Sequence, residues 1–482
     1  MGIRQALAIA TVERYFGLIA SFGLTVVVSR LLTPEEIGIW AIGVAIIALV
    51  TSAREFTPAA YLIQKLDLTA ADIRSAATVI ILISIVVCGV LGFLAPWLAG
   101  VYGEPRLIPY LRVASVAALF DVVALLITSL MRREMAFAEV AIINITGNTT
   151  FLVCTLALAA LGFSYMSFAW ACVASAVLTA MLALALRPDV WMFKPLLQGC
   201  RGILAFGACN GVNVLLYRLF EAAPTMVLGR LISLDAAGHF ARALLVCQLP
   251  DRALLGGIAP VLLPALSAEL RAGRDLKQPY LRALALITCL HWPILIGLAI
   301  LAHPVIQILL GSQWLGTVVL VQTIAPALIF SSANELNYPL LVSVGAMRDV
   351  LLRGLIAWPI SAAIAAVAAV HSIEAAALSF LIILPLQAYI SMCFVRRHVS
   401  IEWLDLARAT WRSGVITLLA IAGPLSIVAA QGFRFDLTIL QGILTGILGA
   451  GGWLAGLHLT QHPMLGELDR VRDVVFARRK AQ

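Results

Sequence analysis

The sequence predicts an all-α integral membrane protein built from two similar halves. Of its 482 residues, 62% are hydrophobic and only 12% are charged, whereas a soluble domain is usually about 45–50% apolar and about 25% charged. The apolar residues form continuous stretches of about 20 residues, which is the length that crosses a bilayer as a helix. In addition, a segment near the N-terminus returns in altered form 200 residues later.

The apolar stretches predict about fourteen transmembrane helices. Transmembrane barrels show instead short alternating segments of about ten residues, which this chain lacks. The first stretch is longer than a signal-peptide core and contains Glu13 and Arg14, so we expect it to stay in the protein. The expected helices are 8–30, 36–58, 75–99, 107–131, 138–161, 164–186, 203–230, 236–266, 281–302, 314–340, 350–370, 375–395, 411–430 and 437–459.

The repeated segment reads SRLLTPEEIGIWAIGVAIIALV at 29–50 and GRLISLDAAGHFARALLVCQLP at 229–250. The two copies align without a gap, and both keep an arginine, a hydroxyl residue, an acidic residue and a glycine. An even number of predicted helices separates them, so they point the same way across the membrane. Such parallel repeats predict two lobes related by a pseudo-two-fold axis along the membrane normal, with a substrate site at their interface.

From this repeat we expect four parts of the chain. They are an N-terminal lobe of helices 1–6, a C-terminal lobe of helices 7–12, two appended helices and a basic amphipathic cytoplasmic tail, at residues 1–190, 191–400, 401–460 and 461–482. Lys and Arg crowd the loops on one side of the predicted spans, and by the positive-inside rule that side is cytoplasmic. Both termini are then cytoplasmic, and the net charge of +8 is a topology signal, which argues against nucleic-acid binding.

Three motifs carry a resemblance to a known family. GHFARALLVCQLP resembles the eighth-helix signature of bacterial polysaccharide-transport flippases, although His239 stands where that family more often has an aromatic residue. SRLLTPEEIGIWA is similar to the family's first outer loop, and MRREMAF to its loop before helix 5. This family belongs to the multidrug/oligosaccharidyl-lipid/polysaccharide exporter superfamily.

The resemblance implies a two-lobe transporter of the bacterial inner membrane that works by alternating access. Its cargo would be undecaprenyl-pyrophosphate-linked oligosaccharide units for lipopolysaccharide, capsule or exopolysaccharide biosynthesis. Its partners would be that lipid-linked oligosaccharide and the membrane lipids, with a polysaccharide polymerase and export machinery as further expected partners. No cofactor, metal site or catalytic constellation is expected, and the chain has no G-x-x-x-x-G-K-[ST] motif for ATP.

Arginines within the predicted spans are the candidate substrate-binding residues. A charge inside a bilayer is costly and is therefore a candidate for function, and a guanidinium binds phosphate oxygens through paired, charge-assisted hydrogen bonds. Arg218 corresponds through the repeat to Leu18, one helical turn from Arg14, so the two arginines meet if their helices face each other. The candidates are Arg14, Arg218, Arg242 and Arg252.

Each candidate has a structural alternative. Glu221 lies three residues after Arg218 and is able to neutralise it, and Arg252 adjoins the Pro250 break as a hinge residue. Candidates for coupling or gating are Glu221, Asp121, Glu335 and Arg54. Two other functions stay open, a peptidoglycan-precursor flippase and a multidrug cation antiporter. The second is disfavoured because the deep charges are mainly arginines, whereas a cation site should be acidic.

Overall fold

The computed structural model describes residues 3–56, 62, 67–198, 200–255 and 259–470, and it is built of helices throughout this part of the chain. Twelve helices in these ranges are long and apolar enough to cross a membrane. The prediction of an all-α membrane protein is therefore confirmed. The chain divides into two compact units, residues 1–241 with 354–373 and residues 242–353 with 374–482.

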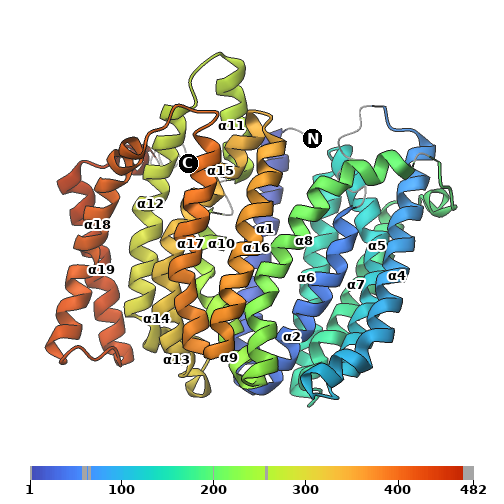
Figure 1. The fold of residues 1–482 in the computed structure, drawn as a ribbon, viewed down its shortest axis with the longest axis horizontal. Helices are drawn as coiled ribbons and strands as arrows, with labels where there is room; N and C mark the ends of the chain where they lie inside the picture. Colours follow the sequence, from blue (N-terminus) through green and yellow to red (C-terminus); the bar gives the residue numbers. More distant parts are fainter. Residues whose placement is uncertain (1–2, 57–61, 63–66, 199, 256–258, 471–482) are drawn as a thin grey trace, which may run out of the picture. The chain divides into compact units, whose positions relative to one another are not determined.

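Unit 1, the first of these, contains the helices of the N-terminal half and most of one helix from the C-terminal half (Figure 1). Its elements are α1 (Ile3–Leu31), α2 (Pro34–Thr51), η1 (Ser52–Phe56), α4 (Ala70–Tyr102), α5 (Leu107–Arg133), α6 (Phe137–Ala160), α7 (Met166–Leu186), η2 (Val190–Phe193), α8 (Cys200–Leu231), the start of α9 (Leu234–Cys247) and the larger part of α16 (Met347–His371).

Unit 2 contains the rest of the described chain. Its further elements are α10 (Leu249–Leu254), α11 (Ala259–Arg271), α12 (Lys277–Ile300), α13 (Ala302–Leu309), η4 (Ser312–Trp314), α14 (Thr317–Ala327), η5 (Leu328–Phe330), α15 (Ser331–Ser343), α17 (Ile373–Val395), α18 (Trp403–Ala430) and α19 (Ile439–Thr460). The boundaries between the units fall inside α9, inside α16 and after the first residue of α17. The lobe boundaries expected from the repeat stay a prediction.

Most predicted spans match observed helices, with two informative differences. The span expected at 236–266 begins as α9 but ends at Cys247, and α10 and α11 follow it. Pro250 stands at the start of α10, where a proline is tolerated because the first backbone N–H groups of a helix need no internal partner. The span expected at 314–340 consists of α14 and α15 joined by the short 3-10 turn η5.

Helix starts follow simple capping chemistry. The side chains of Thr33, Thr69 and Thr438 accept a hydrogen bond from the backbone three residues later, and the acidic or amide side chain at that later position bonds back to the threonine N–H. Each pair is a capping box, which satisfies two helix-terminal donors at once. α4 ends at Gly103 with a φ of 64°, a left-handed conformation that glycine adopts without steric cost.

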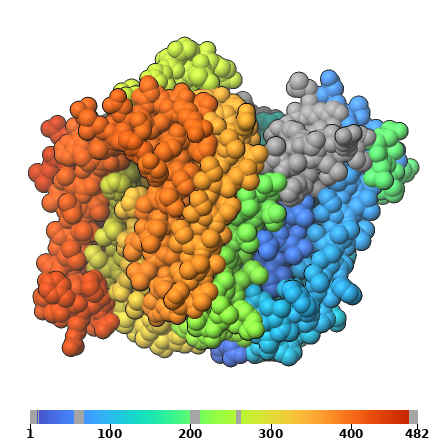
Figure 2. Space-filling view, viewed as in Figure 1, coloured from blue at the N-terminus to red at the C-terminus, as the bar shows by residue number. Residues whose placement is uncertain are grey.

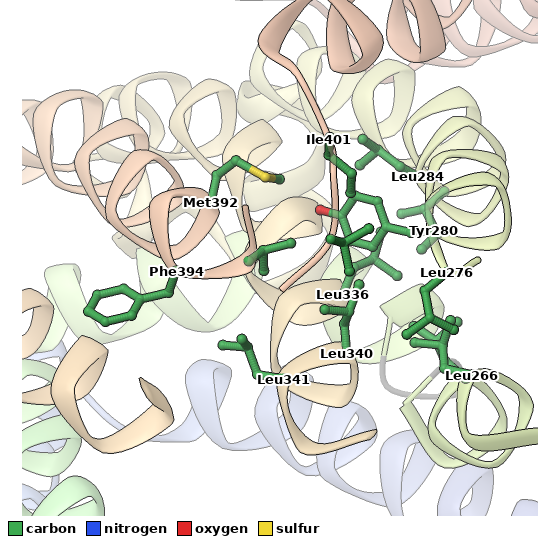
Figure 3. Close-up of a cluster of buried hydrophobic side chains, with 14 of the residues drawn as sticks. Leu266, Leu276, Tyr280, Leu284, Leu336, Leu340, Leu341, Met392, Phe394 and Ile401 are labelled. Carbon is green, nitrogen blue, oxygen red and sulfur yellow. The ribbon is translucent and has the colours of Figure 1, made fainter. Parts of the chain in front are cut away.

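Each unit has its own buried core. In unit 1, apolar side chains from α4, α5, α6, α7 and η2 form one cluster around Ile80, Leu126 and Ile143. In unit 2 the largest cluster joins α11, α12, α15 and α17, with Tyr280, Leu336 and Met392 among its members (Figure 3). Smaller clusters attach α18 and α19 to α12. These cores fix the helices that carry the polar residues described below.

The outer surface of α19 stays apolar. Leu440, Ile443, Ile447 and Leu459 are each more than half exposed on this helix. It belongs to the red C-terminal part of the space-filling view (Figure 2). Exposed apolar faces of this extent are stable in lipid and unfavourable in water. Of the predicted basic tail, residues 471–482 lie outside the described residues. In the part before them, Glu467 accepts a hydrogen bond of 2.8 Å from Arg282 of α12.

Candidate functional site

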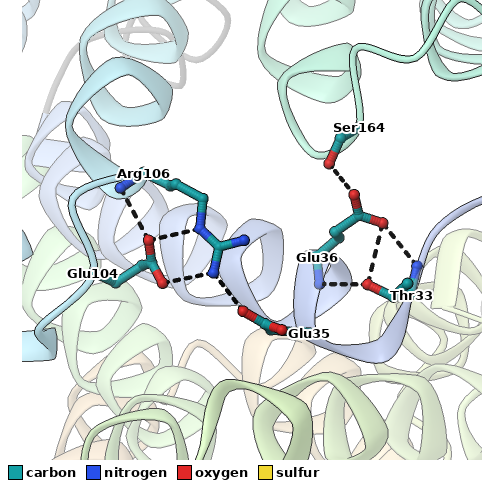
Figure 4. Close-up of polar contacts among 6 residues, drawn as sticks. All are labelled: Thr33, Glu35, Glu36, Glu104, Arg106 and Ser164. Atoms are coloured by element: carbon teal, nitrogen blue, oxygen red, sulfur yellow. Dashed lines mark hydrogen bonds and ion pairs between the residues drawn. The ribbon is translucent and has the colours of Figure 1, made fainter.

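The two copies of the repeated segment begin with the same local structure. In the first copy, the Thr33 hydroxyl accepts a hydrogen bond from the Glu36 N–H at 3.3 Å, and the Glu36 carboxylate accepts one from the Thr33 N–H at 2.8 Å (Figure 4). In the second copy, the Ser233 hydroxyl accepts a hydrogen bond from the Ala236 N–H at 3.0 Å. The conserved hydroxyl residue of the repeat is therefore the N-cap of α2 in one copy and of α9 in the other.

The two copies also contact each other, and the contact is reciprocal. A Cβ atom placed on Gly38 would lie 1.9 Å from the carbonyl oxygen of Leu234, and one placed on Gly238 would lie 2.0 Å from the carbonyl oxygen of Pro34. Residue 38 thus contacts residue 234, and residue 238 contacts residue 34, so each copy makes the same contact with the other. Such a contact is expected at a two-fold axis, and only glycine lets two helix backbones approach so closely.

The first copy is also tied to the next loop of unit 1. Arg106 donates from Nε to Glu104 Oε1 at 2.7 Å and from Nη2 to Glu104 Oε2 at 2.8 Å, and the same Nη2 contacts Glu35 (Figure 4). These hydrogen bonds lower the pKa of Glu104 below its ordinary value, because they favour the ionised carboxylate. Glu36 meets Ser164 of the loop between α6 and α7.

Arg14 and Arg218, the pair expected to converge, lie on α1 and α8 of unit 1. Arg14 is half-buried on α1, which packs against α6. There the Asn144 side chain donates a hydrogen bond of 2.6 Å to the carboxylate of the neighbouring residue Glu13. α8 packs against α2, α4 and η1.

Arg218 is paired with Glu221 in this structure. Its Nη1 atom donates to Glu221 Oε2 at 2.7 Å, and the Tyr217 hydroxyl donates to Glu221 Oε1 at 2.8 Å. The side chains of Arg218 and Glu221 remain 43% and 34% exposed. The neighbouring Tyr217 and Phe220 rings pack on Trp358 of α16. The structural alternative considered for Arg218, neutralisation by Glu221, is therefore present, but the guanidinium is still accessible.

The other two candidate arginines belong to unit 2 and differ in burial. Arg242 is 2% exposed, and its guanidinium carbon lies 5.7 Å from the ring centre of the buried Trp314, which is a cation–π distance. Arg252 is exposed and donates from Nη2 to Gln248 Oε1 at 3.1 Å. Of these two arginines, Arg252 is the accessible one.

Among the residues expected to couple or gate transport, the structure places two in one environment. Asp121 of α5 lies within electrostatic range of Arg54 in η1. Both residues belong to unit 1. Glu335 belongs to α15 of unit 2.

Sequence reasoning missed the polar group around Glu335. Glu335 interacts electrostatically with Asp251 of α10 and with Arg353 of α16. Asp251 Oδ1 lies 2.5 Å from His291 Nε2. The sequence contained a signal, because Asp251, His291 and Arg353 all stand in or beside apolar stretches, but their distance along the chain hid the cluster.

Unit 2 also contains a cavity of about 680 Å³ between α9, α10, α12, α18 and α19. Its wall is formed almost entirely by aliphatic side chains, prolines and glycines, with Trp453 at one side. It offers no charged side chain to a polar ligand. In the described part of the chain, no three His, Cys, Asp or Glu side chains come close enough together to hold a metal ion.

The helices, the paired turns and the apolar surface define a multi-pass membrane protein with the fold of the MOP-superfamily transporters. Its fold aligns with a structure described as "Lipid II flippase MurJ, inward closed conformation" at a TM-score of 0.75 and 12% identity, over 94% of this chain and 99% of that one. A multidrug resistance MATE family transporter of the MOP superfamily aligns at a TM-score of 0.68 and 15% identity, over 80% and 94% of the two chains. At these identities the likeness shows the fold.

The chain belongs to the polysaccharide biosynthesis protein family, whose model matches residues 27–319. It is 23% identical to the lipopolysaccharide biosynthesis protein WzxC of Escherichia coli over 64% of this chain and 62% of that protein. It is 24% identical to the succinoglycan biosynthesis transport protein ExoT of Rhizobium meliloti over 62% and 60% of the two chains. The match thus spans about three fifths of the length of these curated relatives.

Proposed function

We propose that this protein moves lipid-linked oligosaccharide units from the cytoplasmic to the outer leaflet of the bacterial inner membrane. The observation that carries the proposal is the family match over residues 27–319. The relatives are named for lipopolysaccharide, succinoglycan and teichuronic acid, so the common cargo is better sought in the lipid carrier than in one sugar. In this proposal both termini are cytoplasmic. The flipped oligosaccharides become available at the outer face to a polymerase and export machinery. The protein itself carries out no catalysis in this proposal.

Alternating access requires two lobes that move about a fixed contact, with lobe boundaries as the repeat predicts. Gly38 and Gly238 fall in different lobes as the repeat predicts them, although both belong to unit 1 of the structure. Their reciprocal contact supports this mechanism, because it joins equivalent positions of the two copies without an intervening side chain. A backbone-to-backbone contact of this kind can act as a pivot. We infer that the lobes rock about it.

The diphosphate of the cargo needs cationic hydrogen-bond donors, and we propose that Arg14, Arg218 and Arg252 supply them. Arg242 completes the set only if its packing over Trp314 opens during the cycle. The apolar cavity of unit 2 lacks such donors, so it does not suit the head group. Arg54 and Asp121 are proposed to act in gating.

Glu221 gives the arginine site a means of release. In the structure it holds Arg218 at 2.7 Å, and a bound diphosphate would compete for the same guanidinium with more negative charge. We propose that Arg218 exchanges between Glu221 and the cargo as transport proceeds. This is the gating role that the sequence suggested for Glu221.

The proposal is tested in cells that lack the gene and carry variants on a plasmid. Arg218→Ala should lower the amount of surface polysaccharide about tenfold or more, because a hydrogen-bonded charge contributes about 1.5–3 kcal/mol. Arg218→Lys should restore part of the activity, since lysine keeps the charge but loses the paired geometry. Arg112→Ala is the matched control, an exposed arginine on α5 outside the proposed site. Each variant is checked for membrane insertion by immunoblotting.

Normal polysaccharide in Arg218→Ala cells would remove Arg218 from the binding site, and normal polysaccharide in cells lacking the gene would refute the function. The same plasmid also tests the two alternatives. Growth of cells depleted of their own lipid II flippase would favour the peptidoglycan-precursor activity. Raised tolerance to cationic drugs would favour the multidrug antiporter.

A further inference from the structure

Unit 2 contains an ionisable cluster that the proposed diphosphate site does not use. His291 of α12 is fully buried, and its Nε2 atom lies 2.5 Å from Asp251 Oδ1 on α10. The other carboxylate oxygen, Asp251 Oδ2, accepts a hydrogen bond of 2.9 Å from the Ser331 hydroxyl on α15. Three helices thus meet at one carboxylate.

A second carboxylate and one arginine extend the cluster. Glu335 follows Ser331 by one helical turn, so both lie on the same face of α15, and Glu335 interacts electrostatically with Asp251 and Arg353. Arg353 is 8% exposed and donates from Nη1 to the Ser391 hydroxyl at 3.0 Å. Of the two carboxylates, Glu335 therefore interacts directly with the buried guanidinium of Arg353.

The hydrogen bonds continue from Ser391 through neutral groups. Its hydroxyl accepts a second hydrogen bond, of 2.9 Å, from the Asn337 side chain, whose oxygen accepts one of 2.7 Å from the Tyr280 hydroxyl. Both side chains are fully buried. This chain of bonds fixes the Arg353 side chain without changing the charge of the cluster.

The remaining neighbours contribute little charge. Arg252 follows Asp251 in the sequence, but its side chain donates to Gln248, one helical turn earlier. Cys247 and Tyr338 are the neutral titratable groups within electrostatic range of Asp251 and Arg353, respectively. On the turn of α12 before His291, the polar contacts with α18 and α19 join uncharged groups, Thr288 with Ser413 and Cys289 with Trp453. The ion pair between α12 and α18, Lys277 with Asp405, lies at the far start of α12.

The charges of the cluster do not cancel. With His291 neutral, Asp251 and Glu335 carry two negative charges and Arg353 carries one positive charge. Uncompensated charge at membrane depth is unfavourable by several kcal/mol, and one added proton brings the sum to zero. The Nδ1 atom of His291 is also buried and has no hydrogen-bond partner among the described residues.

We propose that Asp251, His291 and Glu335 form a proton-binding site and that one proton crosses through it for each transport cycle. The inference rests on the proposed function for the transport step. A proton fits better than a metal cation, because one oxygen of Asp251 already faces a ring nitrogen of His291 and the other a hydroxyl, and histidine is the side chain that exchanges protons near neutral pH. A cation such as calcium is held instead by a cage of six or more oxygens.

The first test reconstitutes the full chain in liposomes with a fluorescent polyprenyl diphosphate that bears a short oligosaccharide. A pH-sensitive dye inside the vesicles reports proton movement. In the wild type, a pH gradient should accelerate movement of the probe, and protons should move with it. Asp251→Asn and His291→Gln should lower this gradient-driven acceleration about tenfold and abolish the accompanying proton flux.

Serine variants on one helix provide a matched pair. Ser331→Ala removes the hydroxyl that donates to Asp251 and should weaken the coupling. Ser343→Ala removes a hydroxyl on α15 that donates only to the carbonyl of Leu340 and should behave as the wild type. A sodium gradient at constant pH should have no effect.

A second test needs no cargo. Trp292 adjoins His291, and its Nε1 atom donates to the Ile329 carbonyl at 3.0 Å, two residues before Ser331. The fluorescence difference between wild type and Trp292→Phe should therefore change with pH in the purified protein. The same pH-dependent difference should vanish when Asp251→Asn is present in both members of the pair, provided that size-exclusion profiles show folded protein.

The outcomes separate the two proposals. If the wild type does not move the probe but the Trp292 signal depends on pH through Asp251, the proposed cargo fails and the proton site stands. If the probe moves and Asp251→Asn keeps the proton flux, or if sodium replaces protons, the proton site is overturned. A Trp292 signal that does not depend on Asp251 would count against it equally.

Discussion

The two copies of the repeated segment begin alike and continue differently. Both start with a hydroxyl N-cap and reach the reciprocal glycine contact one turn later. α2 then runs to Thr51, whereas α9 ends at Cys247 and is followed by α10. At the equivalent of Val50 the second copy has Pro250, whose missing N–H ends the regular helix.

Two differing positions carry a charged residue in the second copy alone. Ile42 of the first copy is a fully buried core residue, and its equivalent, Arg242, is buried against Trp314. Thr51 bonds to its own helix, and its equivalent, Asp251, contacts His291 and Ser331. The comparison teaches that the shared start of the repeat is structural, while the divergent continuation of the second copy holds the ionisable groups.

The largest expected effect concerns the shared contact. Gly38→Val and Gly238→Val each force a side chain into a carbonyl oxygen about 2 Å away, and overpacking of this kind costs about 1–3 kcal/mol. Thermal unfolding in detergent should show a clear loss of stability for both variants, of similar size because the contact is reciprocal. The double variant should lose less than the sum, since one separation of the helices relieves both clashes.

The control for this prediction is Gly92→Val on α4, where a Cβ atom meets no neighbour within 4 Å. It should leave the unfolding midpoint nearly unchanged. Stable proteins from all three single variants would show that the contact tolerates expansion, and the two copies would then lose their common structural role.

A smaller effect should distinguish the two caps. Thr33→Ala removes an N-cap that also belongs to a capping box, whereas Ser233→Ala removes a single hydrogen bond from the Ala236 N–H. Loss of a cap costs about 1 kcal/mol, and we expect the larger loss of stability for Thr33→Ala. Unfolding midpoints in detergent provide the measurement. Equal losses would mean that the Glu36 carboxylate adds nothing to the first cap.

The smallest effect concerns the ion pair of Glu104 and Arg106, the arginine that also contacts Glu35 of the first copy. Arg106 lowers the pKa of Glu104 from the ordinary value of 4.5, so the stabilisation is complete above that value and is lost as the pH falls through the lowered pKa. Because Arg106 is partly exposed, we expect at most about 1 kcal/mol. Glu104→Gln should be less stable than the wild type at pH 7, and the difference should shrink on acidification. A difference that is constant with pH would contradict this origin.

The sequence predicted the fold closely because the pattern of apolar residues alone sets helix number and length in a bilayer. The repeat, the caps at Thr33 and Ser233 and the small residues at 38 and 238 could all be read from the chain. The candidate site could be predicted from the sequence only in part. Arg218 and Glu221 are near in sequence, and their pairing was considered from spacing alone, whereas Asp251 and His291 are 40 residues apart.

The sequence by itself thus determined an all-α membrane protein with a duplicated turn and arginines at membrane depth, since hydrophobicity, capping and periodicity act locally. Only the tertiary structure decided that His291 faces Asp251, that Arg353 is buried beside Glu335 and that Arg242 packs on Trp314. The physical reason is that the state of a buried charge depends on which helix lies against it. Helix packing brings together residues that no local pattern connects.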